Sequence, residues 1–271
     1  MHILVTNDDG VTEPGILALA QAMRPFGRVT ILGPDRNWSG AGHVKTLHRP
    51  LRVKEVKLDD GSMAFASDGA PSDCVALAML GFIPEKIDLV VSGFNPYANM
   101  GHDVTYSGTV TAAMEAVISK VPGIAFSLAS SDNDPKWNYE TAAEIAGQVV
   151  KTVISVGALA ASAPKDLLLN VNIPNKPIEE IKGLRITRQG MRVYNDDLDV
   201  RLDPRGRKYY WIGGAMPSGI TDEGTDFCAI SEGYVSITPL DLDLTKHGRV
   251  QQLADWPWED REPVIATEGV S

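Results

Sequence analysis

The sequence predicts an α/β protein with a three-layer, Rossmann-like fold and a mostly parallel, doubly wound sheet. Short β-branched runs alternate with longer stretches of helical periodicity through the first half of the 271-residue chain, an order typical of βαβ units. The runs at 3–5, 29–32 and 89–91 are apolar at consecutive positions. Strands that helices cover on both faces have this composition, so a sheet between two helical layers is expected.

The expected core elements follow one another over residues 1–183. HILVTN is the first strand, ILALAQAMRPFG an amphipathic helix and RVTILG the second strand. A helix in CVALAMLGF, a strand in DLVVSG, a helix in TVTAAMEAVISK and a strand in IAFSLAS continue the alternation. Apolar positions at helical spacing predict a further helix over 139–156, and DLLLNVNIP is a buried strand that Pro174 ends.

The pattern changes after Gly183. GLRITRQG, KYYWIGG and GYVSITPL are short runs separated by polar and glycine-rich turns, which favours antiparallel strands or hairpins. We therefore place a soft boundary between a core domain over 1–183 and a smaller region over 184–271. The aromatic residues Tyr209, Tyr210 and Trp211 indicate packing or an interface in this region, and DWPWED either exposes or docks its two tryptophans.

Composition excludes several classes of function. Lys and Arg number 25 against 35 Asp and Glu, a net charge of −10, so a nucleic acid polymer or an anionic membrane is not an expected partner. No signal-peptide pattern is seen and no apolar run approaches the roughly 20 residues of a spanning helix, so a cytoplasmic protein is expected. Cys74 and Cys228 lack a CxxC pattern and are expected to be buried and free.

Polar residues follow three of the predicted strands. In a parallel sheet the loops that leave the carboxyl ends share one edge, where ligands bind. We therefore expect the side chains of these three loops to converge. They are Asp8 and Asp9 after the first strand, Asn37 and Ser39 after the second, and Asn95, Asn99 and Asp103 after the third.

Two adjacent carboxylates, Asp8 and Asp9, end the first strand. One interpretation is an Asp-Gly turn whose side chains are solvated. Convergence with Ser39 and Asn95 favours another, because carboxylate, hydroxyl and amide oxygens suit a hard divalent cation such as Mg²⁺ or Mn²⁺. The cation would neutralise the pair of charges.

The segment YSGTVTAAMEA places Ser107, Gly108 and Thr109 directly before an apolar-periodic helix. Free N–H groups and the positive end of the helix dipole favour a phosphate there, and the two hydroxyls add donors. Simple N-capping by Ser107 or Thr109 is the other interpretation. A cation beside an anion site describes metal-assisted phosphoester hydrolysis, with Asp8 or Asp9 as ligand, general base, or both.

Several motifs span nearly the whole chain: ILVTNDDG, NWSGAG, DGAPSDCV and SGFNPYANMGHDVTYSGTVTAAMEA, followed by LNVNIP, TRQG and GTDFCAISEGYVSITPL. In combination they resemble the survival protein E (SurE) family of metal-dependent 5′- and 3′-nucleotidases. The resemblance implies a Rossmann-like core with one divalent metal ion, Mg²⁺ or Mn²⁺, in each subunit. It implies metal ligands at Asp8, Asp9, Ser39 and Asn95, and phosphate or substrate binding by Asn99, Ser107, Gly108 and Thr109.

The resemblance also implies a homodimer or homotetramer in which C-terminal arms cross between subunits, and some members hydrolyse short polyphosphate. The chain departs from the usual motifs around the expected pocket but keeps the four expected ligands. Tyr97 could narrow the pocket or stack on a base. The departures are Phe94, Tyr97 and His102 in the usual SGINxGxNxGxDV, and Gly42, His43 and Lys45 in the usual SGASNSLT.

Other polar residues near the expected site have open roles. His43 and His102 lie in loops where a histidine can act as acid, phosphate partner or extra ligand, or have no role. Asp103 either orients Asn95 or a metal-bound water, or caps a turn. Asp68 is expected to cap the helix that Pro71 begins.

The sequence therefore predicts a phosphomonoesterase that hydrolyses nucleoside monophosphates through metal-activated water, without a covalent intermediate. One alternative is a non-catalytic nucleotide sensor with a structural metal. It is disfavoured because no GxGxxG motif follows the first strand and because paired aspartates repel a pyrophosphate that carries no metal. A second alternative is an assembly protein that uses the C-terminal region.

Overall fold

The structure is a computed structural model that describes residues 1–130 and 136–258. It contains two compact units, Met1–Leu240 and Asp241–Ser271. The first unit holds the sheet, the helices that cover it and a long hairpin, and it is described first.

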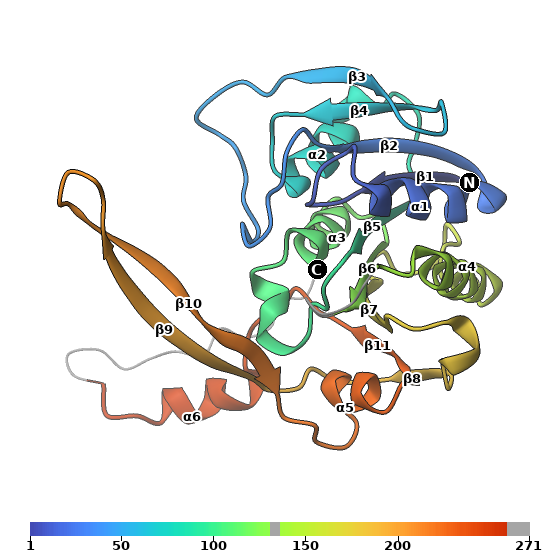
Figure 1. The fold of residues 1–271 in the computed structure, drawn as a ribbon. Helices are drawn as coiled ribbons and strands as arrows, with labels where there is room; N and C mark the ends of the chain where they lie inside the picture. Colours follow the sequence, from blue (N-terminus) through green and yellow to red (C-terminus); the bar gives the residue numbers. More distant parts are fainter. Residues whose placement is uncertain (131–135, 259–271) are drawn as a thin grey trace. The chain divides into compact units, whose positions relative to one another are not determined.

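A nine-stranded sheet within the described residues forms the centre of the first unit, in the order β3-β4-β2-β1-β5-β6-β7-β11-β8 (Figure 1). Along the sheet, every neighbouring pair in the stretch β4-β2-β1-β5-β6-β7 is parallel. At one end β3 is antiparallel to β4, and at the other end β11 is antiparallel to β7 but parallel to β8. The strands are β1 (His2–Thr6), β2 (Arg28–Pro34), β3 (Val53–Lys57), β4 (Met63–Ser67), β5 (Leu89–Asn95), β6 (Gly123–Ala129), β7 (Leu168–Pro174), β8 (Leu184–Ile186) and β11 (Val235–Pro239).

Helices cover both faces of this sheet. α1 and α4 pack on one face, and α2 and α3 pack on the other (Figure 1). The α-helices of this unit are α1 (Pro14–Met23), α2 (Pro71–Leu77), α3 (Gly108–Ile118), α4 (Tyr139–Ser155) and α5 (Asp226–Ser231), with short turns η1 (Arg24–Phe26), η2 (Ala78–Phe82), η3 (Gly101–Thr105) and η4 (Ile178–Glu180).

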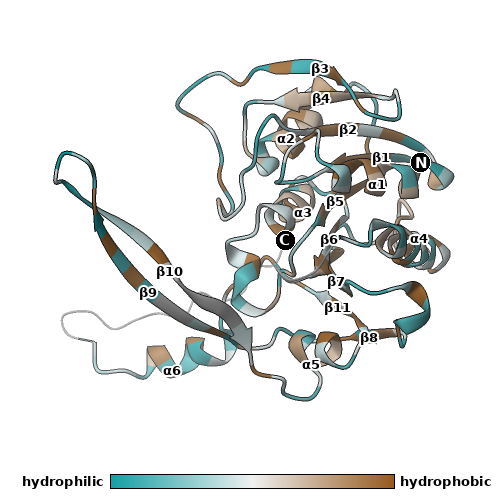
Figure 2. Cartoon of the chain, in the orientation of Figure 1, coloured by the Kyte–Doolittle hydropathy of each residue, from teal (hydrophilic) through white to brown (hydrophobic). Residues whose placement is uncertain are grey.

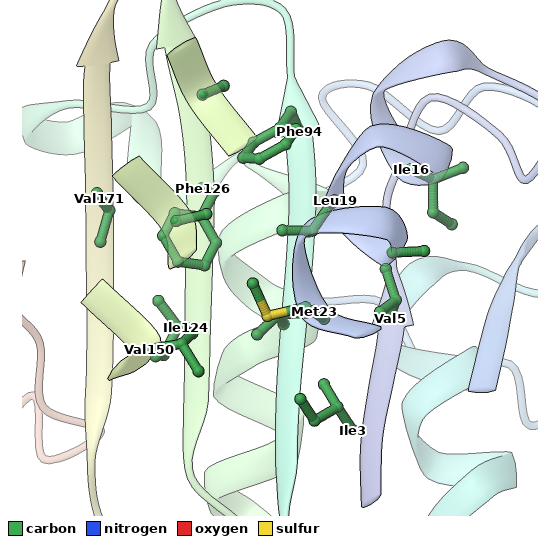
Figure 3. Close-up of a cluster of buried hydrophobic side chains, with 14 of the residues drawn as sticks. Ile3, Val5, Ile16, Leu19, Met23, Phe94, Ile124, Phe126, Val150 and Val171 are labelled. Atoms are coloured by element: carbon green, nitrogen blue, oxygen red, sulfur yellow. The ribbon is translucent and has the colours of Figure 1, made fainter. Parts of the chain in front are cut away.

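Residues of β1 alternate between the two helical layers. Ile3 and Val5 pack against the α1 and α4 side, where Figure 3 shows them, and Leu4 belongs to the cluster on the α2 and α3 side. All three side chains are fully buried. Burial on both faces explains the continuous apolar run. The predicted three-layer, mostly parallel fold is therefore confirmed, and Cys74 and Cys228 are buried and free as expected.

The strand order changes direction between β1 and β5, so the topological switch point of the sheet lies between these two strands. β1 pairs with β2 on one side and with β5 on the other. In open α/β sheets the crevice outside the carboxyl ends at such a point is the usual ligand site. Asp8 follows β1 and Asn95 is the last residue of β5, so both flank this crevice.

The expected cap of α2 is wrong. Pro71 begins the helix and Ala70 is the cap residue. The Ala70 N–H donates to Asp73 Oδ2 at 2.9 Å, whereas Asp68 accepts from the Arg52 N–H at 2.8 Å. Asp68 lies two residues before the cap position, and its carboxylate contacts the segment at Arg52 instead of the first turn of α2.

The region after Gly183 contributes both to the sheet and to a hairpin. β8 and β11 extend the sheet beyond β7, and the first compact unit runs to Leu240. β9 (Arg192–Leu202) and β10 (Lys208–Gly219) pair as an antiparallel ribbon, as the short alternating runs suggested. Figure 1 shows the ribbon projecting away from the sheet.

The second unit is described as far as residue 258. It contains η5 (His247–Arg249) and α6 (Val250–Ala254). Trp256 and Trp258 stack on each other with ring centroids 6.0 Å apart, and each is half exposed. In the described parts of both units, no helix combines the length and the apolar character that crossing a membrane requires.

Candidate active site

A cavity of about 690 Å³ lies at the carboxyl ends of the central strands. Loops from β1, β2 and β5, the start of α3 and the start of α4 supply its walls. The convergence predicted from the strand exits is therefore present. Of the residues named from the sequence, the lining includes Asp8, Asp9, Asn37, Ser39, Asn95, Tyr97, Asn99, Asp103 and Ser107.

Asp8 is held against the start of α3. Its side chain is buried, and Thr109 Oγ1 donates to Asp8 Oδ1. The Trp38 N–H donates to the Asp8 carbonyl at 2.7 Å, which ties the loop after β2 to the end of β1. Burial raises the pKa of Asp8, and hydrogen bonds from the Thr109 hydroxyl and from the N–H groups of Gly108 and Thr109 oppose that rise.

Gly108 gives Asp8 room to approach the helix. A Cβ at position 108 would lie 2.6 Å from Asp8 Cβ and 3.0 Å from Asp8 Oδ2. The anion beside the start of α3 is thus the Asp8 carboxylate, which the positive end of the helix favours. Ser107 caps the helix by accepting from the Val110 N–H at 3.1 Å and also lines the cavity.

The three residues of the predicted phosphate site, Ser107, Gly108 and Thr109, therefore have different surroundings. Ser107 lines the cavity, whereas Gly108 and Thr109 direct their donors to Asp8. Capping by Ser107, the simpler interpretation of the motif, is present. Phosphate binding by the Gly108 and Thr109 positions stays a prediction.

Asp9 is half-buried beside two other carboxylates. Burial, followed by the charges of Asp8 and Glu13, raises the pKa of Asp9 to about 7. Glu13 also lines the cavity. A carboxyl with this pKa gains and loses its proton near neutral pH, as a general base does. The raised pKa also indicates unbalanced negative charge, which a bound cation would offset.

Asn95 is oriented by its own loop. The side chain is nine-tenths buried, and its amide nitrogen donates to the Tyr97 carbonyl. This hydrogen bond uses the nitrogen, so the amide oxygen is the atom available to a cation. Asn95 therefore suits the ligand role implied by the resemblance.

Ser39 lies on a long loop that is tethered by Asp73 of α2, which accepts from the Thr46 N–H at 2.8 Å, and by Glu115 of α3. Its N–H donates to Asn37 Oδ1 at 2.7 Å, and its side chain is exposed at the cavity. Beyond it, the buried Glu115 of α3 accepts from Lys45 at 2.7 Å and contacts His43 Nε2 at 2.9 Å. These contacts hold the loop over the carboxyl end of the sheet.

The two histidines do not line the cavity. His43 contacts Glu115, and His102 is exposed in η3. For His43, the structural reason is the buried carboxylate of Glu115, which draws the ring toward α3.

Asn99 is fixed by a buried polar network. Its N–H donates to Asn172 Oδ1 at 2.8 Å, and its side-chain nitrogen donates to Ser127 Oγ at 2.8 Å. Its carbonyl accepts from the side chains of Asn170, at 2.7 Å, and Asn172, at 3.1 Å. The NVN sequence of β7 thus positions Asn99 at the cavity wall.

Asp103 connects the cavity to the base of the hairpin. Its carboxylate accepts from the Tyr194 hydroxyl at 2.7 Å and lies 2.8 Å from Arg192 Nε. Its oxygens therefore contact β9 and not Asn95, which was one of the expected roles. The Asp103 carbonyl accepts from the Tyr106 and Ser107 N–H groups, so the residue also belongs to a turn.

The charge of the cavity wall is strongly negative. Among the lining residues are the carboxylates of Asp8, Asp9, Glu13, Asp35 and Asp103, against the guanidinium groups of Arg36 and Arg192. Each guanidinium has a carboxylate partner: Arg36 is 3.2 Å from Asp35, and Arg192 pairs with Asp103. An anionic substrate therefore meets repulsion at Asp8 and Asp9 until a cation offsets it.

The donor set at this wall fits a hard divalent cation. Two carboxylates, an amide and a hydroxyl are oxygen ligands of the kind that Mg²⁺ and Mn²⁺ prefer. Within residues 1–130 and 136–258, no group of three His, Cys, Asp or Glu side chains forms a metal site. A cation here would thus depend on Asn95, Ser39, substrate and water in addition to the two aspartates.

Several lining residues were not singled out from the sequence. Trp137 and Tyr139 follow β6, and the loop that leaves this strand is subject to the same edge rule. Tyr106 directly precedes Ser107, so the prediction of Ser107 as a site residue could also have indicated Tyr106. Arg192 belongs to β9 and no local pattern marks it. The polar and aromatic lining residues missed in this way are Thr12, Glu13, Asp35, Arg36, Tyr106, Trp137, Tyr139 and Arg192.

Comparison with known proteins gives consistent results. The family model "Survival protein SurE" matches residues 3–196. A protein named 5′-nucleotidase SurE from Chloroflexus aggregans is 49% identical over 259 residues, 96% of this chain and 100% of that protein. The 5′-nucleotidase SurE of Geobacter sulfurreducens is 49% identical over 256 residues, 94% of each chain. The crystal structure of the SurE protein from Aquifex aeolicus superposes with a TM-score of 0.76 at 41% identity, covering 93% of this chain and 98% of that one.

Proposed function

The chain belongs to the SurE family, and from that membership and the site described above we propose that it is a 5′-nucleotidase. It hydrolyses nucleoside monophosphates to nucleoside and phosphate, and the same site can accept 3′-monophosphates or short polyphosphate. The observation that carries the proposal is the meeting of Asp8, Asp9, Asn95 and Ser107 at one cavity.

The proposal includes one divalent cation, Mg²⁺ or Mn²⁺, held by Asp8, Asp9, Asn95 and Ser39. When bound, the cation neutralises the aspartates, polarises a phosphoryl oxygen and lowers the pKa of a water molecule. Support comes from the excess of carboxylates in the wall and from the raised pKa values of Asp8 and Asp9. Both features indicate a site that lacks positive charge.

The two aspartates have different surroundings and are assigned different roles. Asp8 is buried and receives the Thr109 hydroxyl and N–H groups of α3, which fixes its position and favours its ionised form. Asp9 has fewer partners, and its pKa of about 7 belongs to the site without a cation. A bound cation would lower that pKa, so the Asp9 carboxylate would be ionised at neutral pH and could accept the proton of the attacking water. Ser107 and Asn99 line the cavity and can donate to phosphoryl oxygens.

Phosphate release from a panel of substrates tests this function. The panel is adenosine 5′-monophosphate, adenosine 3′-monophosphate, tripolyphosphate and an aryl phosphate, each with Mg²⁺, with Mn²⁺ and with excess chelator. We expect turnover of the 5′-monophosphate with a metal ion and at least a hundredfold less with chelator. Nucleotide binding without phosphate release would support a sensor, and loss of folding on chelation without any activity would support a structural metal.

We also propose that the chain forms a homodimer or homotetramer through the β9–β10 hairpin. Register places Leu198 opposite Ile212 and Val200 opposite Tyr210, so these four side chains share one face of the ribbon. Their exposed fractions run from 48% to 84%, and Figure 2 shows hydrophobic residues along the ribbon. A two-stranded ribbon with an uncovered apolar face is marginal alone, and a second copy of the chain would cover it.

Mass measurement by light scattering tests the hairpin. Ile212→Asp puts a charge on the apolar face and is expected to convert the oligomer to a monomer without changing the fold of the sheet. Asp199→Asn, on the opposite face beside Trp211, is the control and should keep the wild-type mass. An Ile212→Asp protein with the wild-type mass would place the subunit contact elsewhere.

A cytoplasmic location completes the proposal. Cys74 and Cys228 are both free, which suits a reducing compartment. The net charge of −10 disfavours nucleic acid polymers and anionic membranes as partners, which leaves the nucleoside monophosphate and a second copy of the chain.

A further inference from the structure

A ladder of aromatic rings runs from the core of the first unit to the cavity. Phe94, in β5, stacks with Tyr139 at a centroid distance of 6.2 Å. Tyr139 in turn lies 6.1 Å from Trp137, with the two ring planes tilted by 47°. Phe94 is fully buried, whereas Trp137 is 41% exposed. The ladder therefore ends on an indole that is partly open to solvent.

The open end of the ladder faces the candidate site. Trp137 and Tyr139 both line the cavity that contains Asp8 and Asp9. Burial raises the pKa of Tyr139, and the nearby charges of Asp9 and Glu13 raise it further. Phe94 directly precedes Asn95 in β5. Both inner rings are thus next to residues assigned to the phosphate end, and Trp137 lies one ring further out.

The backbone on both sides of Trp137 is anchored. Asn175, which follows β7, donates from its side chain to the Lys136 carbonyl at 3.0 Å. The same side chain accepts from the Asn138 N–H at 2.7 Å. Asn138 also caps α4 by accepting from the Thr141 N–H at 3.2 Å. One side chain therefore bridges the residues before and after Trp137, which fixes the backbone that carries the indole.

Resting on the proposed nucleotidase function, we propose that Trp137 is the platform on which the nucleobase of a nucleoside monophosphate stacks. The base adds a further ring to the Phe94–Tyr139–Trp137 ladder while the phosphate lies at the Asp8 and Asp9 end. Tyr106, which is 60% exposed and lines the same cavity next to Ser107, supplies a second aromatic surface.

Stacking recognises the faces of a base and not its edge, so this subsite accepts every base and prefers the larger rings. Purine 5′-monophosphates are therefore the preferred substrate class. Ribose 5-phosphate, which has the same phosphoester but no base, loses this contribution entirely.

Steady-state kinetics of the full-length protein with Mn²⁺ tests the subsite. Trp137→Leu is expected to lower kcat/KM for adenosine 5′-monophosphate about ten- to a hundredfold, mainly through KM, because base stacking on an aromatic side chain contributes on that scale. The kcat/KM for ribose 5-phosphate should stay within about twofold. Trp137→Phe keeps a ring and should recover most of the loss.

Phe82→Leu is the matched control, because Phe82 is 39% exposed and does not line the cavity. It should leave both substrates unchanged. If Trp137→Leu lowers kcat/KM equally for adenosine 5′-monophosphate and ribose 5-phosphate, Trp137 has only a structural role and the proposal is overturned. Unchanged values for both substrates overturn it as well.

Equilibrium binding of adenosine separates this proposal from the proposed function. Adenosine carries no phosphate, so its affinity, measured by calorimetry, requires no turnover. The subsite predicts at least tenfold weaker adenosine binding to Trp137→Leu than to the wild type, even if no phosphoester is hydrolysed. Equal affinity of the two proteins overturns the base platform and leaves the nucleotidase assignment intact.

Discussion

Replacing Asp9 with asparagine is expected to lower kcat for adenosine 5′-monophosphate about a thousandfold while the protein stays folded. The substitution keeps the shape of the side chain but removes the negative charge and the proton acceptor. Both are needed at the cavity wall, where Asp8 alone cannot offset a divalent cation. Phosphate release at saturating substrate with Mn²⁺ gives the measurement.

The same substitution is expected to stabilise the protein in the presence of chelator. Asp9 has a pKa of about 7 in the folded state against an ordinary value of 3.8, so the folded protein holds a proton that the unfolded chain releases between these values. The contribution of Asp9 to wild-type stability therefore falls as pH rises from about 4 to 7, and is constant above 7. The asparagine of the variant has no proton to lose, so this part of the fall disappears.

Melting temperatures of both proteins in chelator, at pH 4.5 and pH 7.5, measure the effect. The wild type should lose more stability than Asp9→Asn between these pH values, and adding Mn²⁺ at pH 7.5 should raise the wild-type value more than the variant value. Asp35→Asn, which removes a negative charge from the same cavity wall and an exposed contact with Arg36, is the control. Parallel pH profiles for wild type and Asp9→Asn would contradict the assigned environment of Asp9.

Gly108→Ala is expected to destabilise the protein by about 1–3 kcal/mol and to lower turnover about a hundredfold. Helix propensity alone predicts the opposite sign, because alanine is the better helix former by about 0.5–1 kcal/mol. The new Cβ, however, would lie 2.6 Å from Asp8 Cβ. Asp8 must move away from the start of α3, which breaks its contact with Thr109 and displaces the carboxylate at the cavity.

Gly147→Ala is the matched control for this substitution. Gly147 lies inside α4, and a Cβ there meets nothing within 4 Å, so the variant should gain about 0.5–1 kcal/mol and keep wild-type activity. Urea unfolding in chelator and phosphate release in Mn²⁺ give the two readouts. If Gly108→Ala behaved like Gly147→Ala, Asp8 would not be packed against α3.

The layers of the fold were predictable because they depend on local patterns. Continuous apolar runs in β1, β2 and β5 require cover on both faces. The helix predicted over 139–156 corresponds to α4, Tyr139–Ser155, because apolar positions recur there at helical spacing. The strand-exit rule then brought Asp8, Asp9, Ser39 and Asn95 to one edge without any coordinates.

The partners of individual side chains were less predictable. The serine, glycine and threonine before α3 suggested an anion site, but only the structure shows that Asp8, a residue about a hundred positions earlier, supplies the anion held there by Thr109. The sequence left the role of His43 open, and only the structure shows the buried Glu115 as its partner. Pairings between distant loops depend on packing, and no local spacing encodes them.

Trp137 shows a different limit. Its position after β6 is subject to the same edge rule as the aspartates, yet an aromatic residue in a loop has no distinctive pattern in sequence. Its role follows only from the ladder with Tyr139 and Phe94 and from the Asn175 bridge.

Crystals of the wild-type protein grown with Mn²⁺ and phosphate, measured at the manganese absorption edge, give the most direct test of the central assignment. We expect one anomalous peak in this cavity, with oxygen atoms of Asp8, Asp9 and Asn95 and of a phosphate within bonding distance. A manganese peak away from the two aspartates, or a phosphate bound in the cavity without any metal ion, would contradict it.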